Sequence, residues 1–319
     1  MPRLKTSLLS LATLGALSFG QILYGQNVNT AGPGTLNYIE GQVNIDGQQL
    51  DSQSVGKTQL TNNQSISTEN GKAEILLTPG VFLRLGANST VEMISPSLTK
   101  TEVRLVQGRV NVEVDQLYPQ NLLLIDVPNG QAHLTKKGLY GFDTGNSTIR
   151  VFDGEAQVYP GADLNTNIKP ITVKGGRELA LDGEPGKTQK FDRDSAKDDL
   201  YNWSSLRSQY LGEANANLAE SYAASASFYP GWYWAGWPYG YTWLPGSGLY
   251  SSPFGYGFYS PYYYRVYGPG FYGSPYGWYG RPYGGSYRGG VVVTRPSGGF
   301  SGGVGGFHGG GGFHTGGRR

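Results

Sequence analysis

The feature that most constrains this fold is a run of alternating apolar and polar residues from position 68 to position 114. Turn residues such as Pro79-Gly80 divide the run into short pieces. Side chains alternate across a pleated strand, so a period of two predicts half-buried β-strands and excludes a helix here. We expect the charged residues between the apolar positions to face water. They are Glu74, Arg84, Glu92, Arg104 and Glu113.

The same pattern continues on both sides of this run. Apolar stretches recur about every ten residues with Gly, Asn and Asp turns between them, which is typical of an all-β sandwich, barrel or roll. A short solenoid is the alternative. The further strands that we expect span 36–40, 42–46, 122–127, 131–135, 139–142, 148–152, 155–159, 168–173 and 177–181.

Four segments carry a resemblance to a known family: NGKAEILL, PGVFLRLGANS, RLVQGRVNVEV and IRVFDGEAQVYPG. Together they resemble the periplasmic domain of FecR-like proteins, over residues 35–182. The resemblance implies a compact two-sheet β-sandwich or β-roll. It also implies a place in signalling, because FecR-like proteins pass a signal from an outer-membrane transporter to a cytoplasmic sigma factor. In this chain the cytoplasmic anti-sigma segment of that family is not recognised.

The first twenty residues indicate export. Arg3 and Lys5 precede an apolar run from Leu8 to Phe19, which has the length of a signal peptide and is short for a membrane span. We expect cleavage near Gly20, or as late as position 26, with an uncleaved anchor as the alternative. The chain has no cysteine, so we expect neither disulfides nor a lipid-attachment site. The predicted location is the periplasm or the cell surface, with no transmembrane segment after cleavage.

The period changes from two to that of a helix between residues 195 and 226. Leu200, Trp203, Leu211 and Ala214 fall on one face together with further apolar residues, which predicts one amphipathic helix. The segment from Ser195 to Asp198 resembles a capping box. We expect this helix to dock on an apolar face of the β domain, and binding of a partner is the alternative.

Composition changes again at Phe228. Residues 228–319 hold 28 of the 51 glycines and 16 of the 24 tyrosines, with six arginines, no lysine and no acidic residue. Glycine raises the entropic cost of ordering and proline interrupts hydrogen-bonded ladders, so a disordered low-complexity tail is predicted. The arginines are widely spaced, and we expect no nucleic-acid partner.

The sequence offers little for catalysis. His133 is the one histidine before the tail, and its place in an alternating strand predicts a solvated side chain. Asp143, Asp153 and Glu155 could supply the paired carboxylates of a polysaccharide-processing enzyme, a remote alternative, but turn and edge positions explain them. His308 and His314 lack further ligands. We therefore expect no enzyme, no cofactor and no metal.

These observations predict an exported, non-enzymatic envelope protein whose β domain is an interaction module with an adhesive aromatic tail. The alternative is a periplasmic signal-sensing protein that feeds a separate transducer. The expected partner is an envelope protein or a cell-wall or surface polysaccharide. The candidate contact residues are Trp203, Trp232, Trp234, Trp237, Trp243, Tyr262, Tyr263, Tyr264, Arg265, Arg281 and Arg288.

Overall fold

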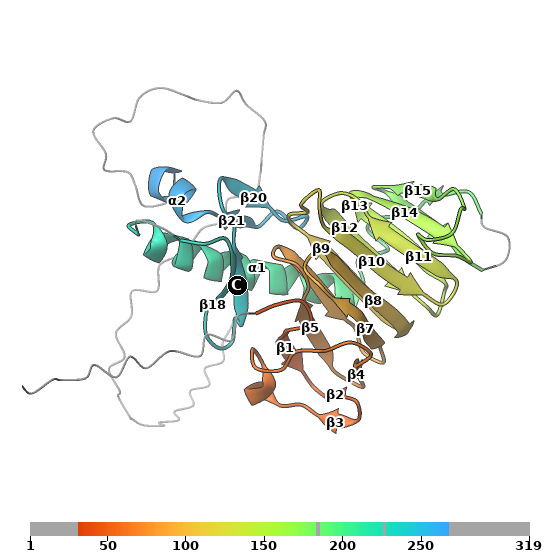
Figure 1. Cartoon of the computed structure of the whole chain (residues 1–319), viewed down its shortest axis with the longest axis horizontal. Coiled ribbons are helices and arrows are strands. Elements are labelled where there is room, and N and C mark those ends of the chain that lie inside the picture. The colour runs from red at the N-terminus through yellow and green to blue at the C-terminus, as the bar shows by residue number, and fades with distance from the viewer. Residues whose placement is uncertain (1–30, 183–185, 226–227, 268–319) are drawn as a thin grey trace, which may run out of the picture. The chain divides into compact units, whose positions relative to one another are not determined.

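A computed structural model describes residues 31–182, 186–225 and 228–267. The predicted signal peptide and most of the predicted tail lie outside these residues. Within them, two large β-sheets dominate (Figure 1), which confirms the predicted all-β fold and its two-sheet arrangement.

The first sheet is antiparallel throughout. In spatial order its strands are β1 (Leu36–Glu40), β5 (Lys72–Leu76), β6 (Val81–Leu85), β9 (Arg109–Val114), β12 (Gly138–Asp143), β13 (Thr148–Asp153), β16 (Arg177–Ala180) and β17 (Gln189–Lys190).

The second sheet contains one parallel pair, between β8 and β10, because the chain passes through β9 of the first sheet between them. A short 3-10 helix, η1 (Ser52–Ser54), precedes β4 along the chain. In spatial order the strands of the second sheet are β15 (Ile171–Lys174), β14 (Glu155–Pro160), β11 (Gly130–Leu134), β10 (Leu122–Val127), β8 (Lys100–Gln107), β7 (Thr90–Pro96), β4 (Ser65–Thr68), β2 (Val43–Ile45) and β3 (Gln48–Gln49).

The main core lies between the two sheets and is built by the alternating residues. Ile75, Leu83 and Val112 from the first sheet and Val91 and Ile125 from the second are fully or almost fully buried in one cluster. Burial of one such side chain contributes about 1.5–3 kcal/mol to folding. The period of two therefore placed these residues on the correct face.

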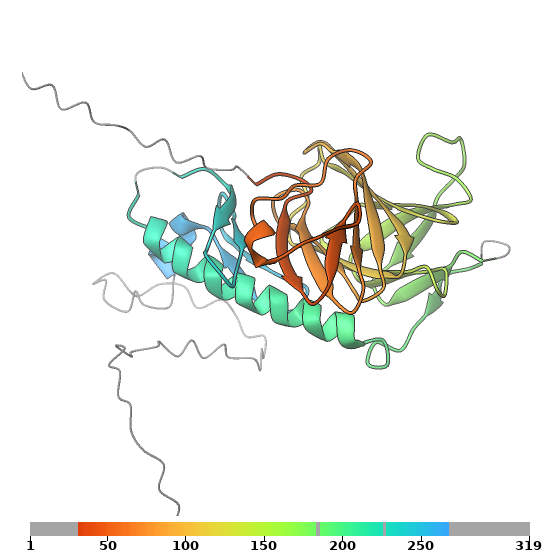
Figure 2. The ribbon, with the colours of Figure 1, turned by 90° about the horizontal axis from the view of Figure 1, so that it is seen from below.

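The long helix α1 (Asp199–Tyr222) packs against β6 and β9 on the outer face of the first sheet (Figure 2). Docking of a helix on the β domain is thus found as predicted, but the contact surface differs. Arg207, Ser208 and Asn215 are buried with the apolar residues, whereas Tyr210 is 40% exposed. The helix is capped by Asp198, whose side chain accepts a hydrogen bond from the Tyr201 amide, and not by Ser195.

The expectation that disorder begins at Phe228 is wrong for residues 228–267. We call this segment the C-terminal module. It folds because its rings find buried partners: Trp243 is fully buried beside Phe82 of β6 and Phe258, which offsets the entropy of its glycines. It comprises β18 (Gly231–Trp234), β19 (Tyr241–Leu244), β20 (Leu249–Ser251), β21 (Gly257–Tyr259) and a second helix, α2 (Pro261–Tyr267).

Side-chain amides fix the module in place. Asn37 of β1 donates to the Tyr241 carbonyl and accepts from the Tyr241 amide, at 3.0 and 2.6 Å. Asn215 of α1 donates to the Trp243 carbonyl and accepts from the Tyr259 amide, at 2.8 and 2.7 Å. Among the described residues, no helix has the length and hydropathy needed to span a membrane.

Candidate functional site

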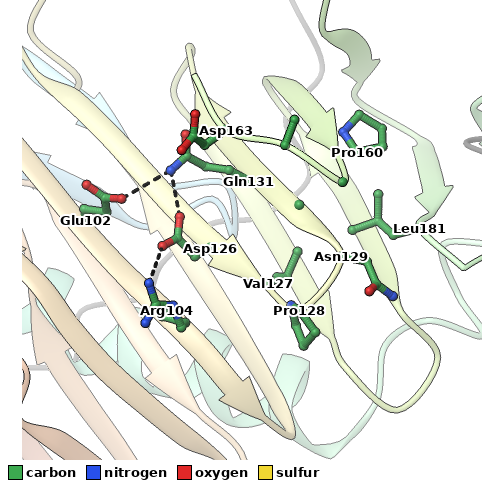
Figure 3. A pocket seen from close by; sticks show the side chains of 13 residues that line it. Glu102, Arg104, Asp126, Val127, Pro128, Asn129, Gln131, Pro160, Asp163 and Leu181 are labelled. Carbon is green, nitrogen blue, oxygen red and sulfur yellow. Dashed lines mark hydrogen bonds and ion pairs between the residues drawn. The ribbon is translucent and has the colours of Figure 1, made fainter. Parts of the chain in front are cut away.

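A polar groove opens where β10 turns into β11, beside the end of β14 (Figure 3). Its volume is about 700 Å³. The groove lies on the second sheet, whereas the helix α1 covers the first. Its lining residues are Glu102, Arg104, Asp126, Val127, Pro128, Asn129, Gly130, Gln131, Pro160, Gly161, Ala162, Asp163 and Leu181.

Gln131 organises the polar side of this groove, as Figure 3 shows. Its amide nitrogen donates to Asp126 Oδ1 at 2.7 Å and to Glu102 Oε1 at 3.2 Å. Its amide oxygen accepts from the backbone nitrogen of Leu164 at 2.9 Å. Gln131 is 4% exposed, so these bonds hold it in one orientation. The groove therefore has a fixed polar wall that spans three strands and one loop.

The charges in the groove are unequal. Glu102, Asp126 and Asp163 supply three carboxylates, and Arg104 is the single cation among the lining residues. Arg104 contacts Asp126 at 3.5 Å and Glu92 at 3.0 Å, and its side chain is 47% exposed. Burial raises the pKa of Asp126, although the hydrogen bond from Gln131 opposes that effect. A donor or cation brought next to Asp126 would favour its ionised form.

The opposite wall carries three apolar side chains beside Asn129. Val127, Pro128 and Leu181 line it, and the Asn129 amide donates to Asp182 Oδ1 at 2.9 Å across the end of the two sheets. Gly130 has φ +152°, and a Cβ there would lie 2.5 Å from the Tyr159 carbonyl oxygen. The groove could bind a polar segment with apolar side chains, since one wall accepts hydrogen bonds and the other offers packing surface.

Nothing in the described residues completes a catalytic constellation. No three His, Cys, Asp or Glu side chains in this part of the chain gather in a way that could hold a metal ion. His133 is half-buried and burial lowers its pKa. Asp143 accepts from the Gly145 amide in a turn, and Glu155 pairs with Lys136 at 3.1 Å. His308 and His314 lie outside the described residues.

A second polar cluster lies beneath α1, and we call it the buried charge network: Glu74, Arg84, Glu113 and Arg207. Glu74 binds Arg84 at 2.7 Å and Arg207 at 2.8 Å, and Arg84 also bonds Glu113. Ser208 of α1 donates to Glu113 at 2.7 Å. The three strand residues are completely buried, so the expectation that they face water is wrong. These three side chains lie on the outer face of the first sheet, and α1 covers that face.

Two carboxylates and two guanidinium groups balance the charge of this network. Burial alone would raise the pKa of Glu74, but Arg207 and Arg84 outweigh it and lower the pKa to about 2. Asp115, at the end of β9, behaves in the opposite way. Burial and then the neighbouring Glu113 raise the pKa of Asp115 well above its usual range, against smaller contributions from Arg84 and Lys137.

Nine of the predicted contact residues lie among the described residues, and they form three groups by exposure. Trp243 is fully buried, and Trp203 and Tyr264 are 8% and 7% exposed, so these three rings present little surface to a partner. Their rings stabilise the fold instead. Trp232 and Tyr263 are half-buried. The exposed group is Trp234, Trp237, Tyr262 and Arg265, while Arg281 and Arg288 lie outside the described residues.

Sequence reasoning missed the groove residues. Gln131 and Asp126 read as ordinary polar positions of two strands, and the spatial neighbour Glu102 lies on a strand that pairs in parallel with β10. The Val-Pro-Asn-Gly turn from Val127 to Gly130 was the available signal, because it marks where the groove opens.

Comparison with known proteins gives one family. The model of the family described as FecR protein matches residues 64–157. No curated protein matches the sequence. Two crystal structures of a proposed anti-sigma factor from Parabacteroides distasonis are similar at 10% identity and a TM-score of 0.33. The matches cover 44% and 49% of this chain, and 63% and 72% of those chains. On the strength of the family match, residues 64–157 of this chain form a FecR-like domain.

Proposed function

We propose that this chain is a FecR-type signal-sensing protein of the cell envelope and that the polar groove receives its partner. The observation that carries the proposal is the position of the groove within the family match. Glu102, Arg104, Asp126 and Gln131 all fall inside the matched residues 64–157. The fixed polar wall of the groove suits the binding of a partner.

The partner that fits is a protein segment with hydrogen-bond donors and at least one cationic side chain. Three carboxylates face one guanidinium group in the groove, so a lysine or arginine would balance the charge. The fixed orientation of Gln131 reduces the ordering cost of binding. Export to the envelope is part of the proposal and is supported by Arg3, Lys5 and the apolar run that follows them.

Adhesion through the aromatic segment is a second candidate function. Trp234 and Trp237 are 46% and 55% exposed, and such rings are favourable contact surfaces. Burial of Trp243 weakens the adhesive interpretation of the whole segment. The buried rings of the C-terminal module mainly stabilise the fold.

Affinity capture from envelope extracts tests the sensing role. The tagged full chain is compared with Asp126→Asn, Asp163→Asn and the control Asp194→Asn, whose side chain is 88% exposed and outside the groove. We expect one discrete protein to be recovered with the wild type and the control, and its recovery to fall about tenfold in both groove variants. Equal recovery by all four proteins would remove the groove from the proposal.

A further inference from the structure

Three side chains form a stack on the outer side of β1. The Arg207 guanidinium lies 4.1 Å from the centre of the Tyr38 ring. Tyr38 in turn stacks on Trp237, with ring centres 5.7 Å apart and an angle of 16° between the planes. Arg207 is buried, whereas Trp237 is 55% exposed. Because one face of the indole rests on Tyr38, the opposite face is presented to solvent.

The loop that carries Trp237 is held rigidly. Arg207 donates to the Tyr239 carbonyl at 2.8 Å, and the Gly240 amide donates to the Gly236 carbonyl at 2.9 Å. Gly240 has φ +82°, and a Cβ there would lie 2.4 Å from the Asn37 carbonyl oxygen. The indole face is therefore positioned before any ligand arrives, which lowers the cost of binding.

Hydrogen-bonding groups border this stack. Glu40 follows Tyr38 on the same face of β1, and one of its carboxylate oxygens accepts from Trp203 Nε1 at 2.9 Å. Glu40 is exposed, so its carboxylate is accessible to a ligand from solvent. Lys72 lies opposite Glu40 in the strand register, 3.9 Å from Asp199. The border thus offers acceptors and a donor.

We propose that Trp237 and Glu40 form a subsite for a pyranose ring of a cell-wall glycan strand. A pyranose has an apolar C–H face that can stack on an indole and a rim of hydroxyls that can donate to a carboxylate. An acetamido group would add an N–H donor for the Glu40 carboxylate, which is exposed at the end of β1. The subsite goes beyond the proposed sensing role, since it lies on the first sheet and the groove on the second.

Calorimetric titration of the purified full chain with chitotetraose and with cellotetraose tests this subsite. Both sugars can stack, and the acetamido groups of chitotetraose distinguish an N-acetylated wall glycan from a plain glucan. We expect chitotetraose to bind more tightly. Trp237→Ala should weaken its binding about tenfold, and Glu40→Gln should weaken it severalfold. Tyr229→Ala, a ring that is 83% exposed elsewhere in the C-terminal module, should leave binding unchanged.

Three outcomes would overturn the proposal: no binding of either sugar, equal binding by Trp237→Ala and the wild type, or equal losses in Trp237→Ala and Tyr229→Ala. Trp237→Phe keeps a smaller ring on Tyr38 and should bind between the wild type and the alanine variant, so a folding defect in Trp237→Ala does not hide the result. Equal partner recovery by the wild type and the groove variants, with sugar binding intact, would refute the sensing role of the groove alone.

Discussion

Replacing Arg207 by methionine tests whether the buried charge network attaches α1 to the β domain. Arg207 is 2% exposed and donates to Glu74 at 2.8 Å and to the Tyr239 carbonyl at 2.8 Å. Methionine keeps much of the volume and removes the charge. The network then holds two carboxylates against one guanidinium group, and the Tyr239 carbonyl loses this donor.

The expected loss is large because the remaining charge is buried. Glu74 keeps Arg84 and Asn37 as partners but has no contact with water. Removing one member of a buried ion pair costs about 3–5 kcal/mol, which is a large share of the 5–15 kcal/mol that stabilises a typical domain. We expect Arg207→Met to lower the free energy of unfolding by that amount in urea titrations followed by circular dichroism.

Lys136→Met is the matched control. Lys136 also pairs with a glutamate, Glu155, at 3.1 Å, but its side chain is 60% exposed. Exposed pairs contribute at most about 1 kcal/mol. If Arg207→Met and Lys136→Met destabilise the protein equally, the argument that the network holds the helix is refuted.

Three further predictions follow from the same geometry. Glu74 has a pKa of about 2 in the folded protein against 4.5 in the unfolded chain, so it contributes about 3 kcal/mol of stability above pH 4.5. This contribution is lost as the pH falls towards 2. Between pH 6 and pH 2, the urea midpoint of unfolding should therefore decrease less for Arg207→Met than for the wild type. The raised pKa of Asp115 affects stability in the opposite direction: the stability that is present below pH 3.8 is lost as the pH rises through the folded pKa of Asp115. Asp115→Asn should therefore stabilise the protein at pH 7 and lose that advantage near pH 4. A variant that is less stable than the wild type at pH 7 would contradict this. Gly240→Ala should cost about 3 kcal/mol and Gly236→Ala about 1 kcal/mol, because both have positive φ but a Cβ only at Gly240 meets the backbone of Asn37; equal costs in thermal unfolding would disprove the close contact.

Much of the β fold is predictable because the alternation of apolar and polar residues in each strand shows which side chains face the core. Val81, Leu83 and Leu85 reach the core as that pattern requires. The outer face of the same strands is not predictable in this way. Glu74 and Arg84 have the pattern of solvated residues, and what buries them is a helix more than a hundred residues later in the chain.

The C-terminal module also depends on contacts between residues that are distant in the sequence. Its glycines and prolines favour disorder when they are considered alone, but the burial of Trp243 depends on Phe82, far away in the sequence. The groove depends on a hydrogen bond from Gln131 of β11 to Glu102 of β8, and β10 lies between these two strands. Local patterns carry no record of such contacts, so the strands could be predicted and the sites could not.

The account rests most directly on the polar groove, and photo-cross-linking in the native host tests it. A photoreactive amino acid at position 163 would lie in the groove, and one at position 172, on the exposed edge strand β15, serves as the control. We predict one discrete envelope protein joined to the chain from position 163 and not from position 172. The absence of a discrete product from position 163, or the same products from both positions, would contradict the proposed function.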